Sequence, residues 1–506
     1  MVAKAKLRNY LWTIAFALIA ALYFYGLTIP LVGPDEPRYA QVAREMFERG
    51  DWMTPTLGGH HWFEKPALVY WLQIASYHLF GVNEFAARFG SALCGLGTVV
   101  SLWFLGRSYS RDFANWLAVI AATTLGILVF ARGASFDIVV TFPITAALVS
   151  FFLYARRTTP PADADSSVAR VPGSDRATIP PATAGGGTDL LALFYFFIGL
   201  ALLAKGLIGI VFPFAIVGLY HLFSRRRPTR AFLFSLLWGT ILAATVASVW
   251  YVPMCLRHGS EFINEFFIAH HFQRFTSNKY QHPQPFYFYL WVFPLMALPW
   301  TPFLIASLVS RIRKSDSPAF RPLMAFAICW MLVPLAFFSF SGSKLPGYVL
   351  PSAAPAIILA VIFLFPRIEN SKAWKNSVAA IAVLIFLLSV AVVSISLPRF
   401  AVGDSVKALV VGGDEAVDTT LRVLMLHTIS HNAEFYAAGR IYRDQTGKQV
   451  RLSGNGELLA VIGSEEKVLV LVPLEYLDTL LRDPRFTCDL VQQNDELAAV
   501  IVSVKY

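Results

Sequence analysis

The chain has few charged residues for its length. Only 15% of its 506 residues are Asp, Glu, Lys or Arg, whereas 56% are hydrophobic and the mean hydropathy is +0.56. A soluble protein of this size needs a charged surface and carries far less apolar side chain. The shortage of charge therefore excludes a water-soluble globular protein and indicates that lipid surrounds most of the chain.

Cysteine is also scarce, and the chain has no Cys-x-x-Cys pair. A small-residue cleavage site after the first apolar run, from about Tyr10 to Pro30, is lacking as well. We therefore expect an uncleaved first membrane helix rather than a signal peptide. The wide spacing of the four cysteines indicates neither a zinc finger nor a disulfide framework; they are Cys94, Cys255, Cys329 and Cys488.

Acidic residues are outnumbered by basic ones, which gives a formal net charge of +10. The basic residues do not form one patch, because they fall in short clusters between apolar runs. Clusters of this kind set the topology of a membrane protein and stay in the cytoplasm. The positive charge is therefore no sign of nucleic-acid binding, and the expected surroundings are a lipid bilayer.

Apolar runs long enough to cross a membrane recur as far as about Leu397. A crossing helix needs roughly 20 apolar residues. The run from Leu190 to Phe223 would make a helix about 51 Å long at ~1.5 Å per residue, so Lys205-Gly206 is predicted to divide it into two short helices. Together the runs predict about eleven crossings, near residues 10–30, 86–106, 113–131, 137–155, 190–204, 206–223, 231–253, 287–309, 320–340, 346–365 and 375–397.

The basic clusters orient these crossings. Once the N-terminal end with Lys4, Lys6 and Arg8 is placed in the cytoplasm, the further clusters fall on the same side. The segment of residues 156–189, rich in Pro, Ala, Gly and Ser, is then predicted to be a flexible cytoplasmic loop. The further clusters are Arg107/Arg111, Arg156/Arg157, Arg225–Arg230, Arg311–Arg321 and Arg367–Lys375.

After Leu397 the composition changes, and short β-like runs alternate with helix-like stretches. The β-like runs are Arg422–Leu426, Lys467–Val472 and Ala498–Val504, and Glu475–Arg482 is helix-like. Residues 399–506 are therefore predicted to form a small α/β domain outside the membrane, in which no catalytic motif is evident. The predicted fold class is an all-α polytopic membrane bundle, residues 1–398, followed by this extracytoplasmic domain.

Polar residues collect in the loops that this topology places outside. The first such loop, residues 31–85, carries Asp35 directly after Pro34. Asp35 is either a general base at a membrane-level cavity or an ordinary loop carboxylate or helix cap. The neighbouring Glu36 is expected to be a charge favoured by a helix N-terminus. The residues Arg38–Arg49 predict an amphipathic helix that lies along the membrane surface.

Two further acidic positions stand next to apolar runs. Glu64-Lys65 is either part of a site or a mutually neutralising interfacial pair. Asp137, at the start of the fourth span, is expected to cap or orient its surroundings, but an acid at that depth is also a candidate for chemistry. His270-His271 is a weak metal signal, because adjacent residues rarely face the same way on a helix. Zinc held by Glu64 with one of these histidines is the metal hypothesis, and no nucleotide cofactor is expected.

Lysines at the outer turns indicate a phosphate site. Lys205 and Lys344 lie between apolar helices, where extension of the side chain toward the interface is the alternative explanation. As phosphate ligands they would neutralise a leaving group whose negative charge grows during a reaction. Three more cations are candidates for the same site: Arg38, Lys65 and Arg274.

Seven motifs resemble, in order, those of the membrane glycosyltransferases of the C type. The most similar group is that of the bacterial lipid A aminoarabinose transferases, which are related to protein O-mannosyltransferases. The motifs are spread over about the first 350 residues, so the match is specific as a set although each motif alone is weak. They are P-D-E-P-R-Y-A at Pro34–Ala40, G-D-W at Gly50–Trp52, F-E-K-P at Phe63–Pro66, F-D at Phe136–Asp137, A-K-G at Ala204–Gly206, H-F-Q-R-F at His271–Phe275 and S-K-L-P-G-Y at Ser343–Tyr348.

The resemblance implies a fold and a set of roles. It implies a transmembrane bundle with two interfacial helices in the first outer loop and an extracytoplasmic C-terminal domain. Asp35 would be the principal catalytic carboxylate and Asp137 the second acid. Trp62 stands where the group often has Tyr, so a phenol is absent there. The carrier phosphate would be held by Arg38, Lys65, Lys205, Arg274, Lys344 and Tyr348, and a metal by Glu64 with His270 or His271.

The leading hypothesis is an inverting sugar transfer from an undecaprenyl-type polyprenyl phosphate to lipid A or another envelope glycolipid, on the outer face of the bacterial inner membrane. A protein acceptor, as in the related mannosyltransferases, is the first alternative. A transporter or flippase is the second, since intramembrane charges also mark transport pathways. A transporter is expected to have charges near the middle of its spans and two halves related by an internal repeat. Here the charges lie at outer helix ends, and no repeat is found.

Overall fold

The computed structural model of the chain describes residues 2–158, 187–273, 284–312, 318–417, 420–463 and 467–505. The chain divides into two compact units. The membrane unit comprises Met1–Tyr25, Glu64–Val69 and Gly90–Val390, and the loop-and-sheet unit comprises Gly26–Phe63, Tyr70–Phe89 and Ala391–Tyr506. Residues 159–186, within the predicted flexible loop, lie outside the described part.

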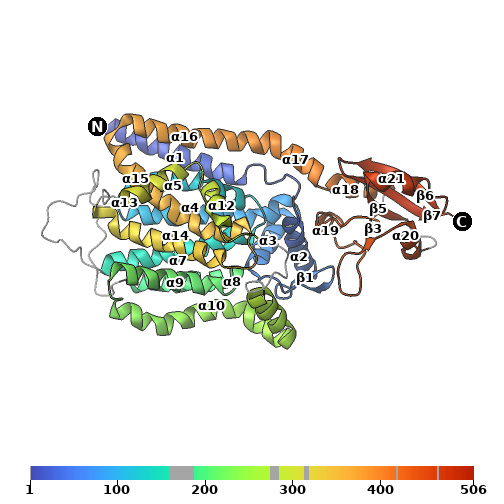
Figure 1. The fold of residues 1–506 in the computed structure, drawn as a ribbon, viewed down its shortest axis with the longest axis horizontal. Helices are drawn as coiled ribbons and strands as arrows, with labels where there is room; N and C mark the ends of the chain where they lie inside the picture. The colour runs from blue at the N-terminus through green and yellow to red at the C-terminus, as the bar shows by residue number, and fades with distance from the viewer. Residues whose placement is uncertain are drawn as a thin grey trace. The chain divides into compact units, whose positions relative to one another are not determined.

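The membrane unit is almost entirely helical (Figure 1). Its apolar helices are long, and large apolar side chains such as Leu237 and Leu384 are exposed on them, as expected for surfaces that face lipid. The elements are α1 (Val2–Phe24), α4 (Glu84–Arg107), α5 (Arg111–Ala122), α6 (Leu125–Ala131), α7 (Phe136–Thr158), α8 (Thr188–Lys205), α9 (Ile208–Ser224), α10 (Arg230–Phe262), η1 (Ile263–Gln273), α12 (Phe288–Met296), α13 (Thr301–Ile312), η2 (Pro318–Phe320), α14 (Arg321–Ser339), η3 (Pro346–Ser352), α15 (Ala353–Asn370) and α16 (Lys372–Ala391).

The described helices confirm a polytopic membrane bundle. Eight are long and apolar enough to cross a membrane, or ten if two bent pairs each count as one span. The bent pairs are α5 with α6 and α12 with α13, which turn by 62° and 113°. The count is lower than the eleven crossings predicted, because the predicted span at residues 206–223 is α9, a shorter apolar helix.

The division of the long apolar run at Lys205-Gly206 is confirmed. α8 ends at Lys205, and α9 begins at Ile208. Gly206 has φ +72, a backbone conformation that side chains disfavour and that glycine adopts without cost. At Gly209 a Cβ would overlap the backbone of Ala201, so the absence of a side chain lets α9 pack closely against α8.

The loop-and-sheet unit begins with the residues that were predicted as the first outer loop. α2 (Asp35–Arg49) confirms the predicted amphipathic helix, since it buries Tyr39, Ala43 and Met46 and exposes Glu48 and Arg49. A short hairpin and α3 follow, so residues 31–85 contain two helices, as the resemblance implied. The hairpin strands are β1 (Thr56–Leu57) and β2 (His60–His61), and α3 spans Leu68–Phe80.

The C-terminal part of this unit is a small α/β domain, as predicted. Its five-stranded sheet has the order β4-β3-β5-β7-β6, in which β3 pairs parallel with β4 and β5, and β7 pairs antiparallel with β5 and β6. Three of the strands are the β-like runs read from the sequence. The elements are α17 (Leu397–Asp404), α18 (Lys407–Val417), β3 (Arg422–Leu426), α19 (Ala433–Tyr436), β4 (Arg451–Leu452), α20 (Asn455–Val461), β5 (Val468–Pro473), α21 (Leu474–Leu481), β6 (Phe486–Gln493) and β7 (Leu497–Val504).

Helices cover both faces of this sheet, which explains its continuous hydrophobic strands. Val423 and Met425 of β3 pack on one face with residues of α18 and α19. Leu424 and Leu426 pack on the other face with residues of α20 and α21. Successive side chains of a strand point to opposite faces, so β3 fills two cores.

A buried ion pair supports the C-terminal domain. Arg443 and Glu434 bond each other with side chains 8% and 2% exposed, and Glu434 also accepts from Gln449. We expect Arg443→Ala to leave the carboxylate without its partner and to destabilise the domain by about 3–5 kcal/mol. Arg482→Ala is the matched control, because its pair with Asp478 is about 80% exposed and worth at most ~1 kcal/mol.

The domain has one cysteine, Cys488, which serves as a reporter of this change. In a background with the other three cysteines replaced by Ala, the rate of thiol labelling at Cys488 follows opening of the domain. Arg443→Ala should accelerate labelling at least tenfold and Arg482→Ala should not. Equal rates in the two variants would show that the buried pair does not hold the domain together.

Candidate functional site

Asp137 and Lys205 form an ion pair at the ends of two helices of the membrane unit. Asp137 lies in the first turn of α7, and Lys205 is the last residue of α8. Their side chains are 18% and 14% exposed, and the ammonium donates to the carboxylate. An acid in the first turn and a base in the last turn both suit the helix dipole. Two of the motifs, F-D and A-K-G, therefore meet in space.

A third motif packs on the same pair. The Nζ of Lys205 lies 4.7 Å from the ring centroid of Tyr348, a distance typical of a cation–π contact. A Cβ at Gly347 would overlap the carboxylate of Asp137, so a larger residue there would displace that carboxylate. The segment Ser343–Tyr348 thus closes around the ion pair. We call Asp137, Lys205, Gly347 and Tyr348 the Asp137 cluster.

Lys344, in the same motif, is buried. Its ammonium donates to the carbonyl oxygens of Gln284 (3.0 Å) and Ser341 (2.7 Å). The hydroxyl of Tyr289 donates to the carbonyl of Leu345 at 3.0 Å, which fixes the adjoining backbone. Carbonyl oxygens orient an ammonium without cancelling its charge. Lys344 is therefore not an exposed lysine that extends toward the interface, which was the alternative explanation from the sequence. Its role as a phosphate ligand stays a prediction.

Glu64 and Lys65 bond each other at 2.7 Å, with side chains about equally buried. The bond matches the alternative read from the sequence, in which Glu64 and Lys65 neutralise each other. The pair is, however, more deeply buried than an interfacial pair on a surface. The zinc site predicted at Glu64 would have to compete with the ammonium of Lys65 for the carboxylate. The side chains of His270 and His271 lie outside the described part of the chain, so that site stays a prediction.

Asp35 is the first residue of α2, in the loop-and-sheet unit. Its carboxylate accepts from the guanidinium of Arg38 at 2.5 Å, yet 51% of its side chain is exposed. The guanidinium of Arg38 also lies 5.9 Å from the ring centroid of Trp62. Arg38 therefore orients the carboxylate while much of it stays accessible, which suits both a base and a first-turn helix charge.

Glu36 has a role beyond that of a helix N-terminal charge. Its carboxylate bonds Arg88 at 2.7 Å and accepts from the backbone amide of Val32. Arg88 is 5% exposed and also donates to the carbonyls of Leu27, Ile29 and Pro30. Arg88 was not predicted as a functional residue from the sequence. The signal was an arginine inside an apolar run, which requires partners.

The predicted site residues fall into two groups. Asp35 and Arg38 belong to the loop-and-sheet unit, and Arg274 lies outside the described residues. A common pocket for all of them stays a prediction. The members found in the membrane unit are Glu64, Lys65, Asp137, Lys205, Lys344 and Tyr348.

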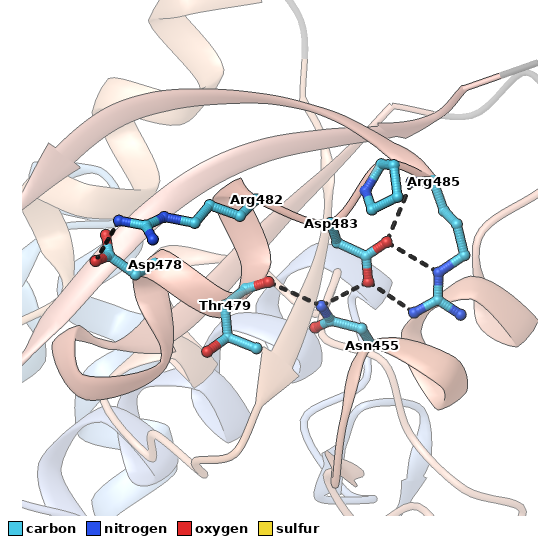
Figure 2. Close-up of a pocket in the computed structure, with 7 residues that line it drawn as sticks. Asn455, Asp478, Thr479, Arg482, Asp483 and Arg485 are labelled. Atoms are coloured by element: carbon cyan, nitrogen blue, oxygen red, sulfur yellow. Dashed lines mark hydrogen bonds and ion pairs between the residues drawn. The ribbon is translucent and has the colours of Figure 1, made fainter.

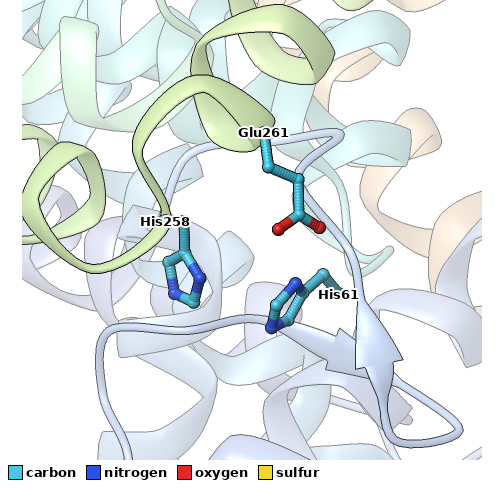
Figure 3. A group of neighbouring side chains, drawn as sticks. All are labelled: His61, His258 and Glu261. Carbon is cyan, nitrogen blue, oxygen red and sulfur yellow. The ribbon is translucent and has the colours of Figure 1, made fainter.

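Two ligand-type side chains that the sequence analysis did not single out lie near the end of α10. His258 and Glu261 flank a kink at Gly259, and their ligand atoms lie within 4.8 Å of one another (Figure 3). The His-x-x-Glu spacing is the signal that would have found them, because residues three apart share a helix face. His61, also drawn in Figure 3, lies on β2 of the loop-and-sheet unit.

A shallow pocket on the C-terminal domain is held together by its own polar groups (Figure 2). The amide of Asn455 donates to the carbonyl of Thr479 and to Asp483, which also accepts from Arg485 at 2.6 Å. These bonds lower the pKa of Asp483, chiefly through Arg485. The groups satisfy one another, so the arrangement is that of a structural network.

The chain resembles known glycosyltransferases in sequence. Residues 11–167 match the family model of dolichyl-phosphate-mannose-protein mannosyltransferases. An undecaprenyl phosphate-alpha-4-amino-4-deoxy-L-arabinose arabinosyl transferase of Serratia proteamaculans is 30% identical over 70% of this chain and 59% of its own length. The transferase of the same name from Aeromonas salmonicida is 32% identical over 75% of this chain and 66% of its own length. The matches thus span somewhat under two thirds of these curated relatives.

The fold is shared with a solved structure. The crystal structure of ArnT from Cupriavidus metallidurans bound to undecaprenyl phosphate superposes with a TM-score of 0.71. The alignment covers 97% of both chains at 22% sequence identity. At that identity the likeness concerns the fold, and it extends over the membrane helices and the C-terminal domain.

The Asp137–Lys205 pair makes a testable contribution to stability. We expect Lys205→Met to destabilise the membrane unit by about 3–5 kcal/mol, because a partly buried carboxylate loses its partner. The double variant Asp137→Asn/Lys205→Met should recover most of that loss. Thermal unfolding of the protein in detergent micelles measures the difference, with Arg157→Met, whose pair with Asp189 is exposed, as the control. Losses that simply add in the double variant would show that the pair is not coupled.

Proposed function

The chain is a member of the C-type membrane glycosyltransferases, in the group related to the aminoarabinose transferases and the protein O-mannosyltransferases, and we propose that it transfers a sugar from a polyprenyl phosphate. The donor in this proposal is an undecaprenyl phosphate sugar and the acceptor is lipid A. The relatives' names, which give undecaprenyl phosphate and an amino-arabinose, support the choice of donor.

The observation that carries the proposal is the Asp137 cluster. Three segments far apart in the sequence, at residues 137, 205 and 343–348, meet at the ends of apolar helices. The cluster contains one cation, Lys205, and the third segment carries a second, Lys344, on two backbone carbonyls. A lipid-linked phosphate would present its charge at such a place, because its chain stays in the hydrocarbon while its head group stays near the interface. Ammonium groups held there stabilise the charge that develops on a leaving phosphate.

The proposed reaction is a displacement with inversion. A hydroxyl oxygen of the acceptor attacks the anomeric carbon, and the bond from that carbon to the phosphate oxygen breaks. The phosphate oxygen keeps the electron pair, and the polyprenyl phosphate leaves. The hydroxyl proton passes to Asp35, whose carboxylate Arg38 orients. Lys65, Lys205 and Lys344 would bind the phosphate as its charge grows.

The positions of the charges favour an enzyme over a transporter. Transport pathways place ionisable groups near mid-membrane. Asp137 lies in the first turn of α7 and Lys205 in the last turn of α8, at helix ends. A protein acceptor is the alternative within the same fold, and an assay that offers both lipid A and a protein acceptor distinguishes the two.

The protein is a multi-pass membrane protein, and its orientation is part of the proposal. Arg107, Arg156 and Arg157 lie in the last turns of α4 and α7, and Arg225 follows the end of α9. The positive-inside rule places these ends in the cytoplasm. The Asp137 cluster, at the opposite ends of α7 and α8, and the C-terminal domain would then face the periplasm of a bacterial inner membrane.

Asp35→Asn tests the proposed base. The amide keeps the shape of the side chain but takes no proton, so we expect transfer to fall about 10²–10⁴-fold while expression and folding stay normal. Asp189→Asn is the matched control, since Asp189 is also an exposed first-turn acid. The measurement is the rate of polyprenyl phosphate release from a donor sugar. Full activity of Asp35→Asn would remove this residue from the mechanism.

Substitution of the lysines tests the phosphate site. We expect Lys65→Met and Lys344→Met each to raise the apparent KM for the carrier about tenfold, since one charge-assisted hydrogen bond is worth roughly 1.5–3 kcal/mol. Lys372→Met, an exposed position at the start of α16, should leave the KM unchanged. Titration with the polyprenyl phosphate alone gives the affinity directly. An unchanged affinity in both variants would show that the carrier phosphate binds elsewhere.

A further inference from the structure

The segment that leads into α2 is held by side chains of the C-terminal domain. The backbone amide of Leu31 donates to the hydroxyl of Tyr436 at 2.7 Å, and the amide of Gly33 donates to Asp404 at 2.9 Å. Gly33 has φ +66, a conformation that favours glycine, and the turn it makes directs the chain into Asp35. Both contacts lie within the loop-and-sheet unit and within four residues of Asp35.

The two acceptors are themselves fixed. The hydroxyl of Tyr436 donates to Glu84 at 3.2 Å, and Glu84 pairs with Lys407 at 2.6 Å. Burial raises the pKa of Tyr436, so its hydroxyl stays protonated and keeps donating. Asn432 donates to the backbone oxygen of Asp404 at 2.7 Å and to its carboxylate at 3.3 Å. Both acceptors are therefore held by other residues of the loop-and-sheet unit.

Carbonyl groups of the same segment accept hydrogen bonds from a residue outside the C-terminal domain. Arg88, at the start of α4, donates to the carbonyls of Leu27, Ile29 and Pro30. Arg88 also donates to Glu36, so it bonds the first turn of α2 as well. Residues 27–36 therefore have carbonyls bonded to Arg88 and amides bonded to the C-terminal domain.

The C-terminal domain also contacts the rest of the first loop. Arg443 fills the space beside Gly58, where a Cβ would overlap its guanidinium, and Arg44 of α2 donates to the carbonyl of Phe435 at 3.4 Å. His431 lies close enough to the Asp35–Arg38 pair for both charges to act on it. Its pKa is lowered by lost hydration and by Arg38, and Asp35 opposes this.

We propose that the C-terminal domain positions Asp35, with Tyr436 and Asp404 as positioning residues that hold the amides of Leu31 and Gly33. The inference rests on the proposed function, because it assigns to Asp35 the chemistry described above. A general base must meet its proton within about 3 Å, and misplacement by about 1 Å costs up to about a hundredfold in rate. The C-terminal domain, which has no catalytic motif, thereby affects the rate of sugar transfer.

Tyr436→Phe removes only the hydroxyl that accepts from Leu31. We expect kcat for sugar transfer to fall about tenfold while the KM for the carrier stays the same, since the phosphate ligands are untouched. Tyr476→Phe is the matched control, because this tyrosine of α21 stacks on His427 and, among the described residues, makes no hydrogen bond or ring contact with the first loop. A purely structural role of Tyr436 would lower the melting temperature and leave kcat of the folded protein unchanged.

Asp404 gives the rescue experiment. Asp404→Ala should lower kcat to a similar extent, whereas Asp404→Asn retains an oxygen that accepts from Gly33 and should keep most of the activity. Equal activity of the wild type, Asp404→Ala and Tyr436→Phe would overturn the proposal. So would equal losses in Asp404→Ala and Asp404→Asn.

Hydrogen exchange separates this inference from the proposed function. The amides of Leu31 and Gly33 should exchange at least tenfold faster in Tyr436→Phe and Asp404→Ala, respectively, than in the wild type. This measurement needs no substrate. A wild-type protein that transfers no sugar would refute the proposed function, whereas unchanged exchange at both amides would refute the positioning role even in an active enzyme.

Discussion

The pairing of charges at the ends of apolar helices is the constraint on which the structure depends. A carboxylate or an ammonium near hydrocarbon is costly unless a partner compensates it. Asp137 and Lys205 compensate each other, and their bond joins the start of α7 to the end of α8. Gly347 then fits against the carboxylate because it has no side chain, and Tyr348 lies beside the ammonium. The Asp137 cluster thus holds three helical segments together.

The loop-and-sheet unit meets the same constraint with a different set of partners. Arg88 is an arginine at the start of an apolar helix, and it is compensated by Glu36 and by three backbone carbonyls. Those carbonyls belong to the segment that leads to Asp35. Two backbone amides of the same segment donate to Tyr436 and Asp404. The chain before Asp35 has little secondary structure of its own, so these bonds replace the bonds that a helix or strand would supply.

Much of the fold followed from local patterns in the sequence. The break at Lys205-Gly206, the amphipathic helix α2 and the strands β3, β5 and β7 were predicted, because each depends on periodicity or on a residue within a few positions. The short strand β4 and the polar strand β6 were missed, since β4 has two residues and β6 exposes most of its side chains. The bends between α5 and α6 and between α12 and α13 were missed as well, because both halves of each pair are apolar.

The contacts of the candidate site were predicted less completely, because they join distant parts of the chain. Leu31 and Tyr436 are 405 positions apart, and Lys205 and Asp137 are 68 apart. Motifs drew attention to Asp137, Lys205 and Tyr348. No local pattern in the sequence predicts that Arg88 bonds Glu36. Nor does any pattern predict that the C-terminal domain, which has no catalytic motif, forms hydrogen bonds with the segment before Asp35.

The proposed reaction moves a sugar from a polyprenyl phosphate to lipid A. Its most direct test is to incubate the purified protein with a panel of undecaprenyl phosphate sugars, lipid A and a protein acceptor, and to follow all products by mass spectrometry. We expect release of undecaprenyl phosphate in equal amount to glycosylated lipid A. Donors that remain intact in the presence of folded protein, or sugar that appears only on the protein acceptor, would contradict it.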